Sequence, residues 1–215
     1  MKQITFYFDV ISPFAALAFE RLPEALTGLD VAVTYQPILL AALLQHWGQK
    51  GPAEMETKRQ WTYRQVAWIA HRQGAELQLP TQHPFNPLAL QRLAWACAGP
   101  QAGPNRYVVE KLFHHVWHGG LDANDAQRLL RLQQDLAPRL DPRSDAVKQA
   151  LRKATDAAIE RGVFGVPTFG IDGRLFWGLD SLEMLAAYLQ GDRWFQGPAW
   201  DEAGAARPGI VRPTS

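Results

Sequence analysis

The chain is poor in cysteine. Cys97 is the single thiol among 215 residues. One thiol excludes an intramolecular disulfide framework and a Cys-x-x-Cys redox pair. Cys97 lies among apolar residues of the segment 91–98, which has a helical pattern. Apolar surroundings raise the pKa of a thiol and make it unreactive, so we expect Cys97 to be buried and inert.

An excess of charge and long apolar runs are also absent. The chain has 22 Lys and Arg against 21 Asp and Glu, a formal net charge of +1. No global field would attract nucleic acid or an anionic membrane, so a small-molecule partner is expected. The N-terminus lacks the features of a signal peptide, and no window has the length of a membrane span. We therefore expect a cytoplasmic protein.

The first 35 residues have the pattern of a β-α-β unit. Aromatic and β-branched residues alternate with polar ones over residues 4–10, which predicts a strand. Ser12 and Pro13 are typical of the start of a helix, and that helix should end near Gly28. Residues 31–35 predict a second strand, parallel to the first through a right-handed crossover.

The remainder predicts a helical block followed by a β-hairpin. The hairpin comprises residues 167–171 and 175–177, joined by the turn Asp172-Gly173, and a last helix starts near Asp180. Apolar residues at helical spacing between breakers predict helices over residues 52–74, 87–98, 105–118, 122–137 and 144–161.

This order predicts an α/β protein with a thioredoxin-like fold and a helical insertion. Residues 1–40 and 144–190 would form the thioredoxin-like domain, and residues 41–143 the inserted helical domain. The tail 191–215 is rich in Gly, Pro and Ala but contains Trp194, Phe195 and Trp200. We expect this tail to be either extended or packed on a partner.

In thioredoxin-like folds the reactive group sits where the first strand meets the first helix, because free N–H groups and the helix dipole favour a thiolate there. That junction reads Ser12-Pro13-Phe14-Ala15. Serine and alanine replace both cysteines of a redox motif, which excludes thiol–disulfide exchange through this site. Ser12 can still donate a hydrogen bond to the thiolate of a ligand; the alternative is that it only caps the helix.

Two segments of the second half would face Ser12. Pro167, in Gly165-Val166-Pro167-Thr168, has the position of the cis-proline of thioredoxin-like folds. If its bond is cis, the Val166 backbone can pair with a peptide-like ligand; otherwise Pro167 is an ordinary proline at a strand start. Asp180 follows the hairpin, and it either accepts the amino group of a γ-glutamyl moiety or only caps the last helix.

With these motifs, residues 3–190 resemble the 2-hydroxychromene-2-carboxylate isomerase family, which is similar to kappa-class glutathione transferases and DsbA-like oxidoreductases. The resemblance is carried by residues 6–14, from Phe6 to Phe14, and by residues 158–168, from Ala158 to Thr168.

The resemblance implies glutathione as cofactor, with Ser12 as the catalytic residue that stabilises its thiolate. It further implies that the thiolate adds to a conjugated aromatic acid, that a bond rotates, and that the thiol is expelled, in a protein that is a homodimer. A kappa-like glutathione transferase and a non-catalytic glutathione-binding protein remain as alternatives. The other residues implied in glutathione binding are Val166, Pro167, Trp177, Gly178, Leu179 and Asp180.

The chain departs from the family pattern at several positions. Leu179 and Ser181 replace an asparagine and an arginine. A lysine and an Asn-Arg pair that would clamp a substrate carboxylate are replaced by Leu44 and Glu54-Met55. Candidate replacements are the cations Lys50, Lys58 and Arg59, and candidate substrate contacts are Phe85 and Asn86, although Asn86 could equally cap the following helix.

Three histidines invite a metal interpretation. His114 and His118 are four residues apart and would share a helix face, with His115 beside them. No third ligand follows at a recognisable spacing, so we expect no metal. Histidines also suit the negative end of a helix dipole, and one of them could line the substrate pocket.

Overall fold

The computed structural model describes residues 1–98 and 103–205. Its four strands form one mixed sheet in the order β2-β1-β3-β4. The central strand β1 pairs parallel with β2 and antiparallel with β3, which pairs antiparallel with β4. The strand bounds are Lys2–Phe8 for β1, Val31–Pro37 for β2, Thr168–Ile171 for β3 and Arg174–Trp177 for β4.

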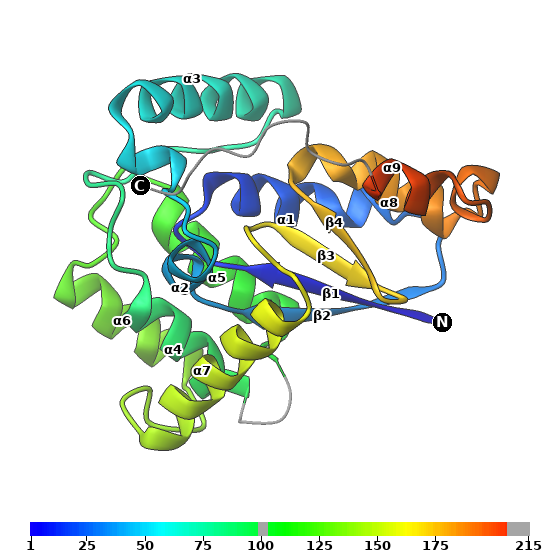
Figure 1. Cartoon of the computed structure of the whole chain (residues 1–215). Helices are drawn as coiled ribbons and strands as arrows, with labels where there is room; N and C mark the ends of the chain where they lie inside the picture. Colours follow the sequence, from blue (N-terminus) through cyan, green and yellow to red (C-terminus); the bar gives the residue numbers. More distant parts are fainter. Residues whose placement is uncertain (99–102, 206–215) are drawn as a thin grey trace.

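The helices cover both faces of this sheet. Figure 1 shows α1 and α8 above the sheet, α7 below it, and α3 lying over α1. This is a thioredoxin-like fold with helices inserted between β2 and β3, as predicted. The bounds are Pro13–Ala25 (α1), Leu40–His46 (α2), Glu56–Gln73 (α3), Leu88–Ala98 (α4), Arg106–Trp117 (α5), Ala126–Leu136 (α6), Asp145–Glu160 (α7), Leu182–Leu189 (α8) and Ala199–Gly204 (α9), with 3₁₀ turns at Pro52–Glu54 (η1), Leu179–Ser181 (η2) and Arg193–Phe195 (η3).

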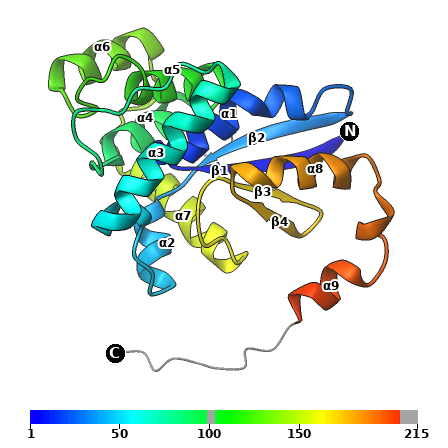
Figure 2. The same cartoon turned by 90° about the horizontal axis from the view of Figure 1, so that it is seen from above.

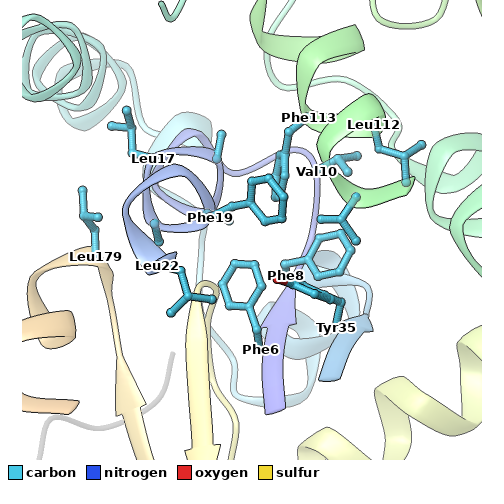
Figure 3. Packing of buried hydrophobic residues seen from close by; sticks show 14 of the residues in the cluster. Phe6, Phe8, Val10, Leu17, Phe19, Leu22, Tyr35, Leu112, Phe113 and Leu179 are labelled. Atoms are coloured by element: carbon cyan, nitrogen blue, oxygen red, sulfur yellow. The ribbon is translucent and has the colours of Figure 1, made fainter. Parts of the chain in front are cut away.

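The alternation of β1 builds the core. Ile4, Phe6 and Phe8 are fully buried in one cluster with α1, whereas Tyr7 packs in a second cluster with α7. The ring of Phe6 stacks on Phe8 and on Phe169 of β3, with centroids 5.6 and 5.1 Å apart. Figure 3 shows Phe6 and Phe8 pointing from the sheet toward the side chains of α1. Each such aromatic contributes about 1.5–3 kcal/mol by burial, so this cluster holds α1 on the sheet.

The structure corrects two of the predicted helix starts. Residues 52–74 do not form one helix, because the chain is extended at Met55, between η1 and α3. The helix predicted from residue 122 begins at Ala126, since Asp125 is the residue whose carboxylate caps it, through the Arg128 amide at 2.8 Å. The short helix α2 was not predicted: its N-cap is Leu39, which offers no capping side chain.

The prediction for the tail is wrong as far as the structure describes it. Residues 193–204 form η3 and α9, which pack against the chain's own sheet rather than extending away. Phe195 is buried, and the Trp200 ring lies 5.4 Å from that of Phe176 on β4. Figure 2 shows α9 on the β4 side of the sheet. The rest of the predicted tail, 206–215, lies outside the described residues.

Candidate functional site

Ser12 lies at the N-terminus of α1 and makes two hydrogen bonds. Its extended backbone ends the turn after β1, and its Oγ accepts the Ala15 amide at 3.2 Å as an N-cap. The same hydroxyl donates to the carbonyl oxygen of Val166 at 3.4 Å. Ser12 is only 7% exposed. The fold therefore holds this hydroxyl at a helix N-terminus, against the segment that precedes β3.

Val166, which contacts Ser12, has a backbone amide that can donate to a ligand. The Val166–Pro167 peptide bond is cis. The carbonyl oxygen of Val166 already accepts one hydrogen bond, from the Ser12 hydroxyl. Among the described residues, the Val166 amide N–H has no hydrogen-bond acceptor. An extended ligand laid beside Val166 would find one unpaired donor there.

A groove of about 990 Å³ begins at Val166 and runs between α1, α3 and the chain after β4. The side chains of Phe14, Trp68 and Ile69 form its apolar walls. It brings together six of the predicted residues: Val166, Pro167, Trp177, Gly178, Leu179 and Asp180. A second hollow of about 970 Å³ lies along β2 and contains none of them.

Asp180 presents a carboxylate to this groove. Among residues 1–98 and 103–205 it has neither a hydrogen bond nor an ion pair, so the alternative that it only caps the last helix is excluded. The chain first forms η2, and α8 then begins after Ser181 without a side-chain cap. Gly178 has a φ of 98°, and a Cβ there would collide with Oδ1 of Asp180. Glycine at 178 thus permits the position of this carboxylate.

The cations at the groove are not those that the sequence suggested. Arg21 on α1 and Arg72 on α3 line it. Arg72 lies over the Trp68 ring, 5.0 Å from its centroid. The guanidinium of Arg59 instead donates to the Ala53 carbonyl at 3.3 Å, and Lys58 lines a separate hollow beside α3. Lys50 is exposed and does not line the groove either.

Asp9 lies beneath the Ser12 turn and is completely buried. Its carboxylate accepts the Ile11 amide at 3.2 Å and the Leu40 amide at 2.9 Å. Burial raises the pKa of Asp9 to about 7, and the two hydrogen bonds oppose that rise. The sequence placed Asp9 in a segment that resembles the isomerase family but assigned it no role.

Several other candidate residues lie away from the groove. Asn86 Oδ1 accepts the Leu88 amide at 3.0 Å, where α4 begins, and Phe85 packs on the core. Their contact with a substrate stays a prediction. His115 is buried and hydrogen bonds to the Ala123 carbonyl. His114 and His118 stack on each other, 4.2 Å apart, and none of the three histidines lines the groove.

Cys97 is half-buried rather than fully buried. Its burial still raises the thiol pKa to about 11, as the apolar surroundings predicted.

The geometry can be compared with known proteins. Residues 3–190 match the family of DSBA-like thioredoxin domains. The 2-hydroxychromene-2-carboxylate isomerase of Sphingobium xenophagum is 31% identical over 196 residues, which are 87% of this chain and 98% of that protein. The chain belongs to this isomerase family, within the DSBA-like thioredoxin domains.

Two further similarities are at lower identity, and the solved structure bears on the fold alone. Glutathione S-transferase kappa 1 of Rattus norvegicus is 26% identical over 212 residues, 90% of this chain and 92% of that protein. The solved structure of a 2-hydroxychromene-2-carboxylate isomerase superposes with a TM-score of 0.76 at 24% identity, covering 95% of this chain and all of the other. The family member described here is therefore an enzyme, an isomerase with glutathione transferase as the alternative activity.

The described helices include none with the length and apolar character needed to cross a membrane.

Proposed function

We propose that this isomerase-family enzyme uses glutathione to isomerise an aromatic acid that resembles 2-hydroxychromene-2-carboxylate. The observation that carries the proposal is the Ser12 hydroxyl, held 3.4 Å from the Val166 carbonyl beside a groove with an unpaired carboxylate. The names of the relatives support the reaction class and the use of glutathione.

The groove is lined by the acidic residues Glu20, Glu24 and Asp180 and by the basic residues Arg21 and Arg72. Glutathione has two carboxylates and one ammonium group, so both kinds of charge find residues of opposite sign there. Asp180 would accept the ammonium group of the γ-glutamyl end. Arg21 and Arg72 would hold the carboxylates, in place of the arginine that the family pattern has at the position of Ser181. The Val166 amide would donate to the cysteine backbone of glutathione. The residues present therefore fit this cofactor.

Bound glutathione supplies a thiolate that adds to the conjugated acid and leaves after a bond has rotated. Ser12 contributes a hydroxyl with one proton and two acceptor lone pairs. It can keep the Ala15 amide as a donor while its own proton turns from the Val166 carbonyl to the thiolate. The N-terminus of α1 adds the positive end of a helix dipole, which also stabilises a thiolate.

The aromatic ring of the acid has matching surfaces at the groove. Trp68 and Trp177 line it, and Trp177 is 52% exposed. The ring of Phe164 packs on Trp177 with centroids 4.8 Å apart. Exposed aromatic side chains beside the thiol position favour a flat, apolar substrate.

Glutathione transfer is the second candidate, favoured by the kappa-class relatives and by the absence of the usual carboxylate clamp at Leu44 and Glu54-Met55. A non-catalytic glutathione-binding protein is the third candidate. We also propose that the protein is cytoplasmic, as predicted from the sequence, and that it is a homodimer, which only the resemblance to the family implies. Sedimentation of the purified chain tests the dimer.

Product analysis tests the proposal. The enzyme is incubated with glutathione and 2-hydroxychromene-2-carboxylate, and both products are quantified. Isomerised acid with unchanged total glutathione is expected. A stable thioether would instead establish transfer, and glutathione binding without turnover would establish the non-catalytic alternative.

A further inference from the structure

The backbone of the turn before Ser12 is bound by side chains from several elements. The indole of Trp117, on α5, donates to the Val10 carbonyl at 2.9 Å. The Ile11 amide is held by Asp9, and the Ile11 carbonyl lies 2.8 Å from Nε2 of His83. The residue immediately before Ser12 is thus fixed through both its amide and its carbonyl.

The contact with Ile11 determines the tautomer of His83. A carbonyl oxygen can only accept, so Nε2 must carry a proton. Burial lowers the pKa of His83, which favours the neutral ring. Nδ1 of the neutral ring is an acceptor, and the Tyr63 hydroxyl lies 2.8 Å from it and 2.9 Å from the His83 carbonyl. The single hydroxyl proton is shared between these two acceptors, and both belong to His83. Tyr63 therefore orients the ring while the ring holds Ile11.

This chain of contacts connects the groove wall to the Ser12 turn. Tyr63 belongs to α3, the helix that also contributes Trp68 and Arg72 to the groove. His83 also packs on Trp117, with ring centroids 5.5 Å apart, so its ring is supported from a second side. His83 is far from Ser12 in sequence, and no pattern in the sequence suggested that the two were related.

We propose that His83 is a positioning residue, which holds the Ile11 carbonyl so that the Ser12 hydroxyl meets the thiol of bound glutathione. The inference rests on the proposed function. His83 reaches the Ser12 turn through the Ile11 carbonyl and does not line the groove. A change at His83 should therefore alter the acidity of the bound thiol rather than the binding of the γ-glutamyl end. An anchor that is merely structural would lower stability without changing thiol acidity.

The variants separate these roles. His83→Ala removes the donor to Ile11, His83→Gln keeps an N–H donor in its place, and Tyr63→Phe removes only the orienting hydroxyl. His71→Ala is the matched control, because His71 is exposed on α3 and does not line the groove. For each, calorimetry gives the Kd of glutathione, and ultraviolet titration gives the pKa of the bound thiol.

We expect His83→Ala to raise the bound thiol pKa by on the order of one unit, a tenfold loss of thiolate below that pKa, with Kd changed less than about threefold. Tyr63→Phe should also raise the pKa of the bound thiol, but by less. His83→Gln should give a thiol pKa between those of wild type and His83→Ala, and His71→Ala should leave the thiol pKa unchanged. If His83→Ala does not fold, as judged by circular dichroism, Tyr63→Phe decides.

An unchanged thiol pKa in the folded His83 and Tyr63 variants would overturn this inference while wild-type binding preserves the proposed function. Equal shifts in the His71 control would also overturn it. A wild-type chain that binds no glutathione would overturn both.

Discussion

The hydroxyl of Ser12 donates to the carbonyl of Val166 at 3.4 Å, although 154 positions separate the two residues in the chain. This bond joins the N-terminus of α1 to the segment that leads into β3. Ser12 itself does not line the groove of mixed charge, but the bond ties this serine, which replaces a redox cysteine, to Val166, which does.

Ser12→Ala should lower the free energy of unfolding by about 1 kcal/mol, because the Ala15 amide loses its cap. Ser144→Ala is a matched control, since Ser144 caps α7 through the Val147 amide and lies away from the groove. Urea denaturation measures both. Equal stability of wild type and the Ser12 variant would contradict the capping role.

Asp180→Asn should weaken glutathione binding about tenfold, because a charge-assisted hydrogen bond to the ammonium group becomes a neutral one. Glu183→Gln removes an equal charge from the nearby exposed surface of α8 and controls for the general field. Calorimetry at fixed salt gives both Kd values. If the two variants weaken binding equally, Asp180 makes no specific contact.

Stability should depend on pH through Asp9. Its pKa is about 7 in the fold against 3.8 for the ordinary side chain, so the folded state holds this proton more tightly. The stabilisation of the folded state by this proton is fully present below the unfolded-state pKa of 3.8. It is lost as the pH rises to the folded-state pKa of about 7. Between about pH 5 and about pH 8 the loss is roughly 2.5 kcal/mol.

Asp9→Asn should therefore flatten this pH dependence, and urea denaturation at the two pH values tests it. If the free energy of unfolding changes equally between the two pH values in wild type and variant, Asp9 does not titrate as its burial requires.

Much of the fold follows from local patterns. The alternation in β1, the capping serines of α1 and α7 and the Asp172-Gly173 turn each act within a few residues, so they predict their elements directly. The helix α2 escaped prediction because it has no capping side chain, and the extended residue Met55 interrupts an otherwise helical pattern.

The site was predictable only where one segment carries it. Ser12 and the residues after β4 stand in recognisable motifs. Arg21 and Arg72 look like ordinary solvated helix charges in the sequence, and only the packing of α3 over α1 brings them to one groove. His83 likewise reaches Ile11 through tertiary folding, which no local spacing encodes.

Cys97 should resist alkylation in the folded protein. With a pKa of about 11, roughly one thiol in a thousand is ionised near pH 8. Iodoacetamide labelling followed by mass spectrometry should show modification much slower than that of free glutathione, and rapid modification in urea. Rapid labelling of the folded chain would contradict the raised pKa.

The most direct test of the central claim is the ultraviolet titration of the bound thiol in wild type, Ser12→Ala and Ser144→Ala at saturating glutathione. We expect wild type and the Ser144 variant to lower the thiol pKa below that of free glutathione, and the Ser12 variant not to lower it. A thiol pKa in the Ser12 variant as low as in wild type would contradict it.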